Sequence, residues 1–322
     1  MLQALIQITG GFILLVWGAD RLVAGAAAAA RNIGISPLVV GLTIIGFGTS
    51  APELVVSAIA AAQGSPALAV GNAIGSNITN IGLVLGLTAI VYPLRVESSI
   101  LKREFPVLML IMVIVSWLMY DGLLSRVDGV LLLVGLFAML GAMVFIGIKR
   151  SDSDPLVKEF EAEIPSDMPT STALFWLVIG LIVLPISSSV LVDGSISIAR
   201  ILGVSDAVIG LTIVALGTSL PELAAALSAA VKHEDEIAIG NVIGSNMFNL
   251  LGVLGIAATI NPVSINYDLI HRDSLAMYVF TLLLFMLAWG IRGPGRIRRR
   301  AGVLLLAMYL FYQAVVITSA LT

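Results

Sequence analysis

The sequence has 322 residues, of which 59% are hydrophobic and only 11% are charged, whereas about a quarter of the residues of a typical soluble domain are charged. This composition excludes a water-soluble globular enzyme. The absence of cysteine excludes disulfide frameworks, thiolate metal sites and cysteine nucleophiles, and the net charge of −3 offers no basic surface for nucleic acid.

Ten apolar stretches follow one another along the chain, each bounded by polar clusters. About 20 apolar residues cross the ~30 Å hydrocarbon core of a bilayer, and each stretch approaches or exceeds that length. The predicted helices in chain order are 3–30, 36–62, 67–92, 104–120, 127–149, 171–199, 206–231, 237–260, 274–291 and 300–320. We therefore predict an all-α polytopic membrane protein with ten transmembrane helices.

The loops between these helices differ in basic charge. Loops after odd-numbered helices hold thirteen Lys and Arg residues, and loops after even-numbered helices hold three. Because cytoplasmic loops carry the excess of basic residues, we expect the odd loops to be cytoplasmic and both termini to be extracytoplasmic. The expected location is the plasma (inner) membrane, with the first stretch kept as a span because it lacks the features of a cleaved signal peptide.

The sequence contains an internal repeat. GLTIIGFGTSAPEL at 41–54 recurs as GLTIVALGTSLPEL at 210–223, and GNAIGSNITNIGLVLG at 71–86 recurs as GNVIGSNMFNLLGVLG at 240–255, both after 169 residues. This duplication predicts two five-helix units joined by an acidic cytoplasmic linker. The predicted divisions are 1–149, with repeated segments 41–57 and 71–86; the linker 150–170; and 171–322, with repeated segments 210–226 and 240–255. Because each unit has an odd number of spans, the second unit is inverted, as in many secondary transporters.

The first repeated segment places a proline and a carboxylate in the middle of an apolar helix. Pro52 and Pro221 each remove a backbone donor and clash with the carbonyl four residues earlier. We therefore expect broken helices in which nearby carbonyls, such as those of Gly46 and Ala215, lose helix partners. A carboxylate at mid-bilayer costs roughly 2.5 kcal/mol or more and usually marks an ion or proton pathway. Glu53 and Glu222 are therefore the first candidates for a transport site.

Hydroxyl and amide groups accompany the two glutamates at helical spacing. Thr49 and Thr218 lie four residues before the glutamates, on the same helix face. The second repeated segment carries polar residues in steps of four: Asn72, Ser76 and Asn80, and again Asn241, Ser245 and Asn249. We expect Ser76, Asn80, Ser245 and Asn249 to lie opposite the carboxylates, because the units are inverted. The asparagines at 72, 77, 241 and 246 fit a helix-packing seam equally well.

The collected groups are all hard oxygen donors, with neither imidazole nor sulfur among them. Such donors suit Na⁺ or Ca²⁺, and Ca²⁺ takes six to eight oxygens. Two carboxylates neutralise one Ca²⁺, two Na⁺ or two H⁺, so competing cations can alternate in one site. This charge balance is what an exchanger requires.

The repeated motifs GTS-x-PE and GN-x-x-GSN resemble the α-repeats of the cation/Ca²⁺ antiporter superfamily, most closely those of prokaryotic sodium/calcium exchanger-like inner-membrane proteins. The resemblance covers essentially the whole chain. It implies alternating access by a secondary active antiporter that moves Ca²⁺ out of the cytoplasm in exchange for Na⁺ or H⁺. The implied ion ligands are Glu53, Glu222, Asn80, Asn249, Thr49, Thr218, Ser50, Ser219, Ser76 and Ser245, with the carbonyls of Gly46 and Ala215.

One position departs from some relatives. Where certain exchangers, including potassium-dependent ones, have aspartate, this chain has Asn249. The site therefore carries a formal charge of −2 rather than −3. This difference argues against potassium dependence and against a fixed stoichiometry of three Na⁺.

The long first and sixth helices carry charges at Asp20, Arg21 and Asp193. The resemblance makes these helices gates that slide over the core, so one hypothesis is a regulatory ion pair. The alternative is an interfacial charge satisfied by water or by a neighbouring side chain.

Other functions remain open from the residues alone. A monovalent Na⁺/H⁺ exchanger or a Ca²⁺/H⁺ exchanger would differ only in which cations compete. A passive cation channel is a more distant alternative, because the polarity is concentrated at one depth. An intramembrane enzyme would need a nucleophile with a base within reach, and neither histidine falls within a predicted span. We expect no cofactor, no nucleic acid and no obligatory protein partner; the partners are Ca²⁺, Na⁺ or H⁺ and the lipid bilayer.

Overall fold

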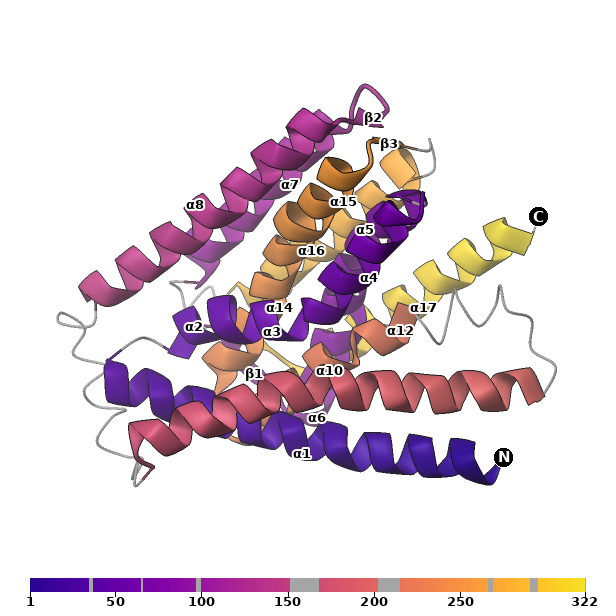
Figure 1. Cartoon of the computed structure of the whole chain (residues 1–322). Coiled ribbons are helices and arrows are strands. Elements are labelled where there is room, and N and C mark those ends of the chain that lie inside the picture. The colour runs from indigo at the N-terminus through magenta and orange to yellow at the C-terminus, as the bar shows by residue number, and fades with distance from the viewer. Residues whose placement is uncertain are drawn as a thin grey trace.

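The computed structural model describes residues 1–34, 37–64, 66–96, 100–150, 168–201, 215–265, 269–289 and 295–321. Helices account for almost all of this part of the chain (Figure 1). Within these described ranges, seven helices are long and apolar enough to cross a membrane, and a helix pair bent by 49° makes an eighth. The other two predicted spans are helical as well, but the beginning of one, 206–214, lies outside the described residues, as does 151–167 of the linker.

Two long helices lie side by side across the others in Figure 1: α1 (Leu2–Ile33) and α10 (Thr170–Ile201). They run antiparallel and pack closely through small residues. A Cβ atom at Gly25 of α1 would lie 2.6 Å from the carbonyl oxygen of Ala173 on α10. Only glycine therefore permits this approach between the two backbones.

The predicted span 36–62 is a broken helix. It consists of α2 (Pro37–Val40), a π-helical turn η1 (Gly41–Ile45), α3 (Gly46–Thr49) and, after a break at Ser50, α4 (Ala51–Ala62). The second copy has α12 (Ala215–Thr218), a break at Ser219 and α13 (Leu220–Val231). The proline-induced breaks are confirmed in both copies.

The most buried helices follow these breaks. The first comprises α5 (Pro66–Thr79), the π-helical turn η2 (Asn80–Leu85) and α6 (Gly86–Val91); the second comprises α14 (Asp235–Phe248), η5 (Asn249–Val253) and α15 (Leu254–Ile260). Both are surrounded by other helices, which is why polar residues on them can meet protein partners instead of lipid.

Two helix pairs flank this centre. The first pair is η3 (Ile100–Glu104) with α7 (Phe105–Leu118), followed by α8 (Arg126–Arg150); the second is η6 (Leu269–Asp273) with α16 (Ser274–Ala288), followed by α17 (Arg299–Leu321). From α3 to η3 the elements of the first half recur after the same 169 residues in the second half. The predicted all-α membrane fold built from a repeated five-helix unit is confirmed.

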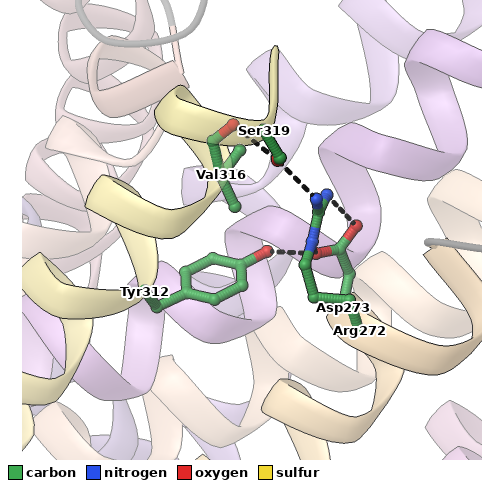
Figure 2. A network of polar contacts seen from close by, with 5 residues as sticks. All are labelled: Arg272, Asp273, Tyr312, Val316 and Ser319. Atoms are coloured by element: carbon green, nitrogen blue, oxygen red, sulfur yellow. Dashed lines mark hydrogen bonds and ion pairs between the residues drawn. The ribbon is translucent and has the colours of Figure 1, made fainter. Parts of the chain in front are cut away.

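A polar network ties the last helix to η6, which directly precedes α16 (Figure 2). Tyr312 of α17 donates a hydrogen bond to a carboxylate oxygen of Asp273 at 2.9 Å. The guanidinium of Arg272 bonds to the same carboxylate at 2.8 Å and to the hydroxyl of Ser319 at 2.7 Å. Both ends of this ion pair are thus satisfied by α17, which holds that helix in place.

Short antiparallel strands, which the sequence does not predict, join loops that are distant in sequence. β1 (Leu94–Val96) pairs with β4 (Gly295–Ile297), and β2 (Leu123–Leu124) pairs with β3 (Val263–Ser264). The first pair joins two odd-numbered loops, and the second joins two even-numbered loops. This pairing agrees with odd and even loops lying on opposite faces.

Candidate functional site

The breaks bring hydroxyls and carboxylates into the interior. Ser50 adopts φ −82° and ψ 3°, and Ser219 adopts φ −90° and ψ 3°, so each leaves the helical path just before a proline. Glu53 and Glu222 then stand in the first turn of α4 and α13, where the helix N-terminus favours negative charge. The local sequence therefore explains both the break and the placement of the carboxylate.

The two carboxylates are fully enclosed. Glu53 is 1% exposed and Glu222 is 0% exposed, and they lie close enough for their charges to interact. The hydroxyl of Ser50 donates to Glu222 Oε1 at 3.2 Å, and the hydroxyl of Thr218 donates to Glu53. The break of each half therefore contacts the carboxylate of the other half.

Two amides lie where the π-helical turns begin. Asn80 starts η2 and Asn249 starts η5, and both side chains are buried. The η2 turn packs against α13, which carries Glu222, and the η5 turn packs against α4, which carries Glu53. Each amide therefore belongs to the surroundings of the opposite carboxylate.

Five buried oxygens of these residues have no hydrogen-bond partner within the described ranges. They are Glu53 Oε2, Glu222 Oε2, Asn80 Oδ1, Asn249 Oδ1 and Ser219 Oγ. A buried polar atom without a partner is costly, so a group of five calls for an explanation. A bound cation satisfies acceptor oxygens of this kind.

A hydroxyl-rich contact closes the first break against α14. The Thr49 hydroxyl donates to Asn241 Oδ1 at 3.0 Å and lies 3.3 Å from the Ser245 hydroxyl. Ser245 in turn donates to the carbonyl of Gly46 at 3.3 Å. Asn241 also donates to the backbone carbonyl of Glu222 at 3.3 Å. From the sequence, this residue fits a helix-packing role and a role in the site equally well.

The expectation that the Gly46 carbonyl loses its helix partner is wrong. The amide of Ser50 still donates to that carbonyl at 3.1 Å, because the chain turns away only at Ser50 itself. In the second half the equivalent amide of Ser219 donates to the carbonyl of Leu216 at 3.2 Å. Ala215 stands at the start of α12.

The structure brings most of the predicted ligands together, with one member less connected. Ser76 is buried on α5, but no hydrogen bond joins it to the other predicted residues in the described part of the chain. Thr218 is half-buried at the end of α12.

The two halves of the site also differ in exposure. Gly71 is exposed and Asn72 is half-buried on α5, whereas their equivalents Gly240 and Asn241 on α14 are buried. Asn72 donates to the hydroxyl of Ser57 at 3.2 Å, whereas Asn241 donates to the backbone carbonyl of Glu222.

The candidate site carries little negative charge for its number of oxygen donors. Within the described residues, no cluster of three or more His, Cys, Asp or Glu side chains could hold a metal ion. Any cation in this region would therefore be bound by two carboxylates together with amide, hydroxyl and carbonyl oxygens. This donor set suits a hard cation that binds and is released again. It suits a tightly held structural metal less well.

A repeated helical unit with a paired break and a buried carboxylate in each copy defines a membrane transporter rather than an enzyme. Comparison with known proteins identifies which kind. The family model described as "Sodium/calcium exchanger protein" matches residues 3–145 and 172–318. The chain belongs to the sodium/calcium exchanger family.

Similar proteins cover nearly the full length. The chain is 47% identical to the putative antiporter CaxA of Alkalimonas amylolytica, over 99% of this chain and 100% of that protein. It is 40% identical to the inner membrane protein YrbG of Escherichia coli, over 98% and 97%. Among solved structures, the sodium-calcium exchanger NCX_Mj soaked with zero Na⁺ and Ca²⁺ aligns with a TM-score of 0.84 at 35% identity, over 98% of this chain and 99% of that one.

Proposed function

We propose that this protein is a secondary antiporter that moves Ca²⁺ out of the cytoplasm in exchange for Na⁺ or H⁺, by alternating access at the site between the two breaks. The observation that carries the proposal is the group of five buried oxygens without partners, which belong to Glu53, Glu222, Asn80, Asn249 and Ser219. Two carboxylate, two amide and one hydroxyl oxygen are hard donors of the kind that Ca²⁺ prefers, and the further ligands proposed below bring the number toward the six to eight that Ca²⁺ takes.

The charge of the site supports exchange. Two carboxylates balance one Ca²⁺ or two monovalent cations, so either load leaves a neutral interior that can move through the membrane. An empty site keeps two buried charges close together, which is unfavourable. The cost of that empty state couples the outward and inward movements, as obligatory exchange demands.

The proposed ligands form two equivalent sets, one from each half of the chain. The side-chain ligands are Glu53, Asn80, Thr49, Ser50 and Ser76 from the first half, and Glu222, Asn249, Thr218, Ser219 and Ser245 from the second. The carbonyls of Gly46 and Ala215 complete them. Asn241 joins the two sets through its bonds to Thr49 and to the Glu222 backbone.

The organisation of the chain follows from the repeat and from the basic loops. We propose two inverted units, 1–149 and 171–322, joined by the acidic linker 150–170 on the cytoplasmic side, with both termini extracytoplasmic. The similarity to an inner membrane protein of Escherichia coli supports a place in the plasma (inner) membrane. The bilayer and the transported ions are then the only partners that the activity requires.

The test is ⁴⁵Ca²⁺ uptake into proteoliposomes driven by Na⁺, K⁺ or H⁺ gradients. We expect saturable uptake that needs an opposing Na⁺ or H⁺ gradient and gains nothing from K⁺. Glu53→Gln and Glu222→Gln each remove half of the site charge, so we expect a loss of at least tenfold in Ca²⁺ exchange. Asp121→Asn serves as the matched control, since that carboxylate caps a loop at Leu123.

The outcomes separate the alternatives. Full Ca²⁺ exchange by both glutamine variants would contradict the site. Na⁺/H⁺ exchange without Ca²⁺ uptake would replace the proposal with a monovalent exchanger, and Ca²⁺ uptake driven by H⁺ alone would make the protein a Ca²⁺/H⁺ exchanger. Flux that neither saturates nor needs a counter-ion would indicate a channel.

A further inference from the structure

Two buried asparagines stand behind the amides of the site. Asn77 on α5 and Asn246 on α14 lie three residues before Asn80 and Asn249, and each is 1% exposed. Asn80 Nδ2 donates to Asn246 Oδ1 at 3.0 Å, and Asn249 Nδ2 donates to Asn77 Oδ1 at 3.3 Å. The two bonds are equivalent under the 169-residue repeat, so the same arrangement occurs twice.

A second contact fixes which end of each supporting amide faces the site. Asn246 Nδ2 donates to the backbone carbonyl of Asn77 at 3.5 Å, and Asn77 Nδ2 faces the sulfur of Met277 at 3.5 Å. Because an amide has one acceptor end and one donor end, Oδ1 of each supporting residue is left to accept from the site amide. The NH₂ groups of Asn80 and Asn249 are thereby engaged, and their Oδ1 atoms are the ends without a partner.

We propose that Asn77 and Asn246 are positioning residues, which hold Asn80 and Asn249 with their carbonyl oxygens toward the transported cation. The inference rests on the proposed function, since it assigns these oxygens to ion binding. The bonds run between halves, so each half of the protein orients an ion ligand of the other half. A small rotation between the halves would therefore turn both ligands together.

The chemistry of the amide explains why this support matters. Without the acceptor behind it, the Asn80 or Asn249 side chain can turn its NH₂ group toward the site, which replaces a ligand by a donor that repels a cation. A hydrogen bond of this kind is worth about 0.5–1.5 kcal/mol, or about two- to tenfold in binding. We expect the loss in the apparent affinity for the cation and little change in the maximal rate.

The experiment uses substitutions that remove or keep the acceptor. Asn246→Leu and Asn77→Leu remove it and should raise the Ca²⁺ concentration for half-maximal exchange about two- to tenfold. Asn246→Asp and Asn77→Asp keep an acceptor oxygen and should restore an affinity at least equal to that of the wild type. Asn261→Leu is the matched control, because the Asn261 amide also crosses between the halves, to the Ala61 carbonyl at 3.4 Å, but contacts no site residue.

A double-mutant cycle separates positioning from general stability. If Asn246 acts through Asn80, Asn246→Leu should weaken equilibrium binding of ⁴⁵Ca²⁺ and ²²Na⁺ in the wild type but add nothing in an Asn80→Ala background. The same holds for Asn77→Leu with Asn249→Ala. Equal losses in both backgrounds, or no rescue by the aspartate variants, would overturn the inference. Absence of Ca²⁺ exchange by the wild type would instead contradict the proposed function, and the ²²Na⁺ cycle would then decide the inference by itself.

Discussion

At the scale of single residues, the side chain at position 249 determines the charge of the candidate site. Asn249 is buried at the start of η5, and its Oδ1 has no partner while its Nδ2 donates to Asn77. An aspartate there would bring a third carboxylate to the same enclosed region as Glu53 and Glu222. A charge added at about 4 Å changes the interaction with a divalent cation about twice as much as with a monovalent one.

We therefore expect Asn249→Asp to shift the competition between Ca²⁺ and Na⁺ toward Ca²⁺ by about tenfold or more. Asn77 would turn its NH₂ group toward the new carboxylate, so the contact between these residues would persist. The measurement is inhibition of ⁴⁵Ca²⁺ uptake by external Na⁺, compared between wild type and variant. Unchanged affinities for both ions in a well-folded variant would show that position 249 does not face the cation.

The identities of the polar residues were predictable, and their contacts were only partly so. The repeat singles out Glu53 and Glu222 because a carboxylate in an apolar span is rare and expensive. The sequence does not show that Asn80 donates to Asn246 and Asn249 to Asn77. The two asparagines of each half have the same spacing and differ only in the helices that pack against them. The bond from Ser50 to the Gly46 carbonyl was missed for a similar reason, since a proline indicates a break but not the residue where the chain turns.

At the scale of helices, close packing determines which glycines cannot be replaced by a residue with a Cβ atom. A Cβ atom at Gly244 of α14 would lie 2.3 Å from the carbonyl oxygen of Leu42 in η1, a backbone atom that cannot move aside. At Gly141 of α8, which is exposed, no described atom lies within 4 Å of the added Cβ. The cost of an added methyl group therefore differs between these two glycines.

This difference makes a stability prediction with a built-in control. Gly244→Ala should destabilise the protein by about 1–3 kcal/mol, as overpacked core substitutions do, whereas Gly141→Ala on the exposed face of α8 should not lower the melting temperature. Thermal unfolding in detergent, followed by tryptophan fluorescence, measures both. Equal melting temperatures of the two variants would contradict the close approach of η1 to α14.

Long helices were predictable at this scale, and short elements were not. An apolar run of 20 or more residues is a strong signal for a span, and all ten ranges coincide with helices where the chain is described. Strands of two or three residues, such as β2 and β1, have no periodic pattern to detect. They form because distant loops meet, which depends on how the helices are arranged.

At the scale of the whole molecule, one ion pair helps to fix how α1 and α10 lie over the remaining helices. Asp20 of α1 forms an ion pair at 2.6 Å with Lys232, which caps the C-terminus of α13. Beside it, the guanidinium of Arg21 lies 4.8 Å from the ring centre of Trp176 on α10. Asp20, one of the charges considered from the sequence for a regulatory ion pair, therefore has a partner at the end of the helix that carries Glu222.

The inverted repeat gives this ion pair a consequence for transport. The equivalents of Asp20 and Lys232 in the other halves are Ser189 and Gln63, which carry no charge. If alternating access exchanges the arrangements of the two units, the opposite state lacks this ion pair, so Asp20 and Lys232 stabilise only the state seen here. Lys232→Gln, which copies Gln63, should therefore shift the balance between the two states. An exposed ion pair contributes about 0.2–1 kcal/mol, which corresponds to a shift of about 1.4- to fivefold in their ratio.

The shift should be visible as a change in the ratio of Ca²⁺ affinities measured from the two sides of the membrane, in right-side-out and inside-out vesicles. Because the ion pair is partly exposed, raising the ionic strength with choline chloride should move the wild type toward the variant. Lys102→Gln, which removes a lysine from η3, should leave the ratio unchanged. Equal ratios for Lys232→Gln and the wild type would show that the contact between α1 and α13 does not distinguish the two states.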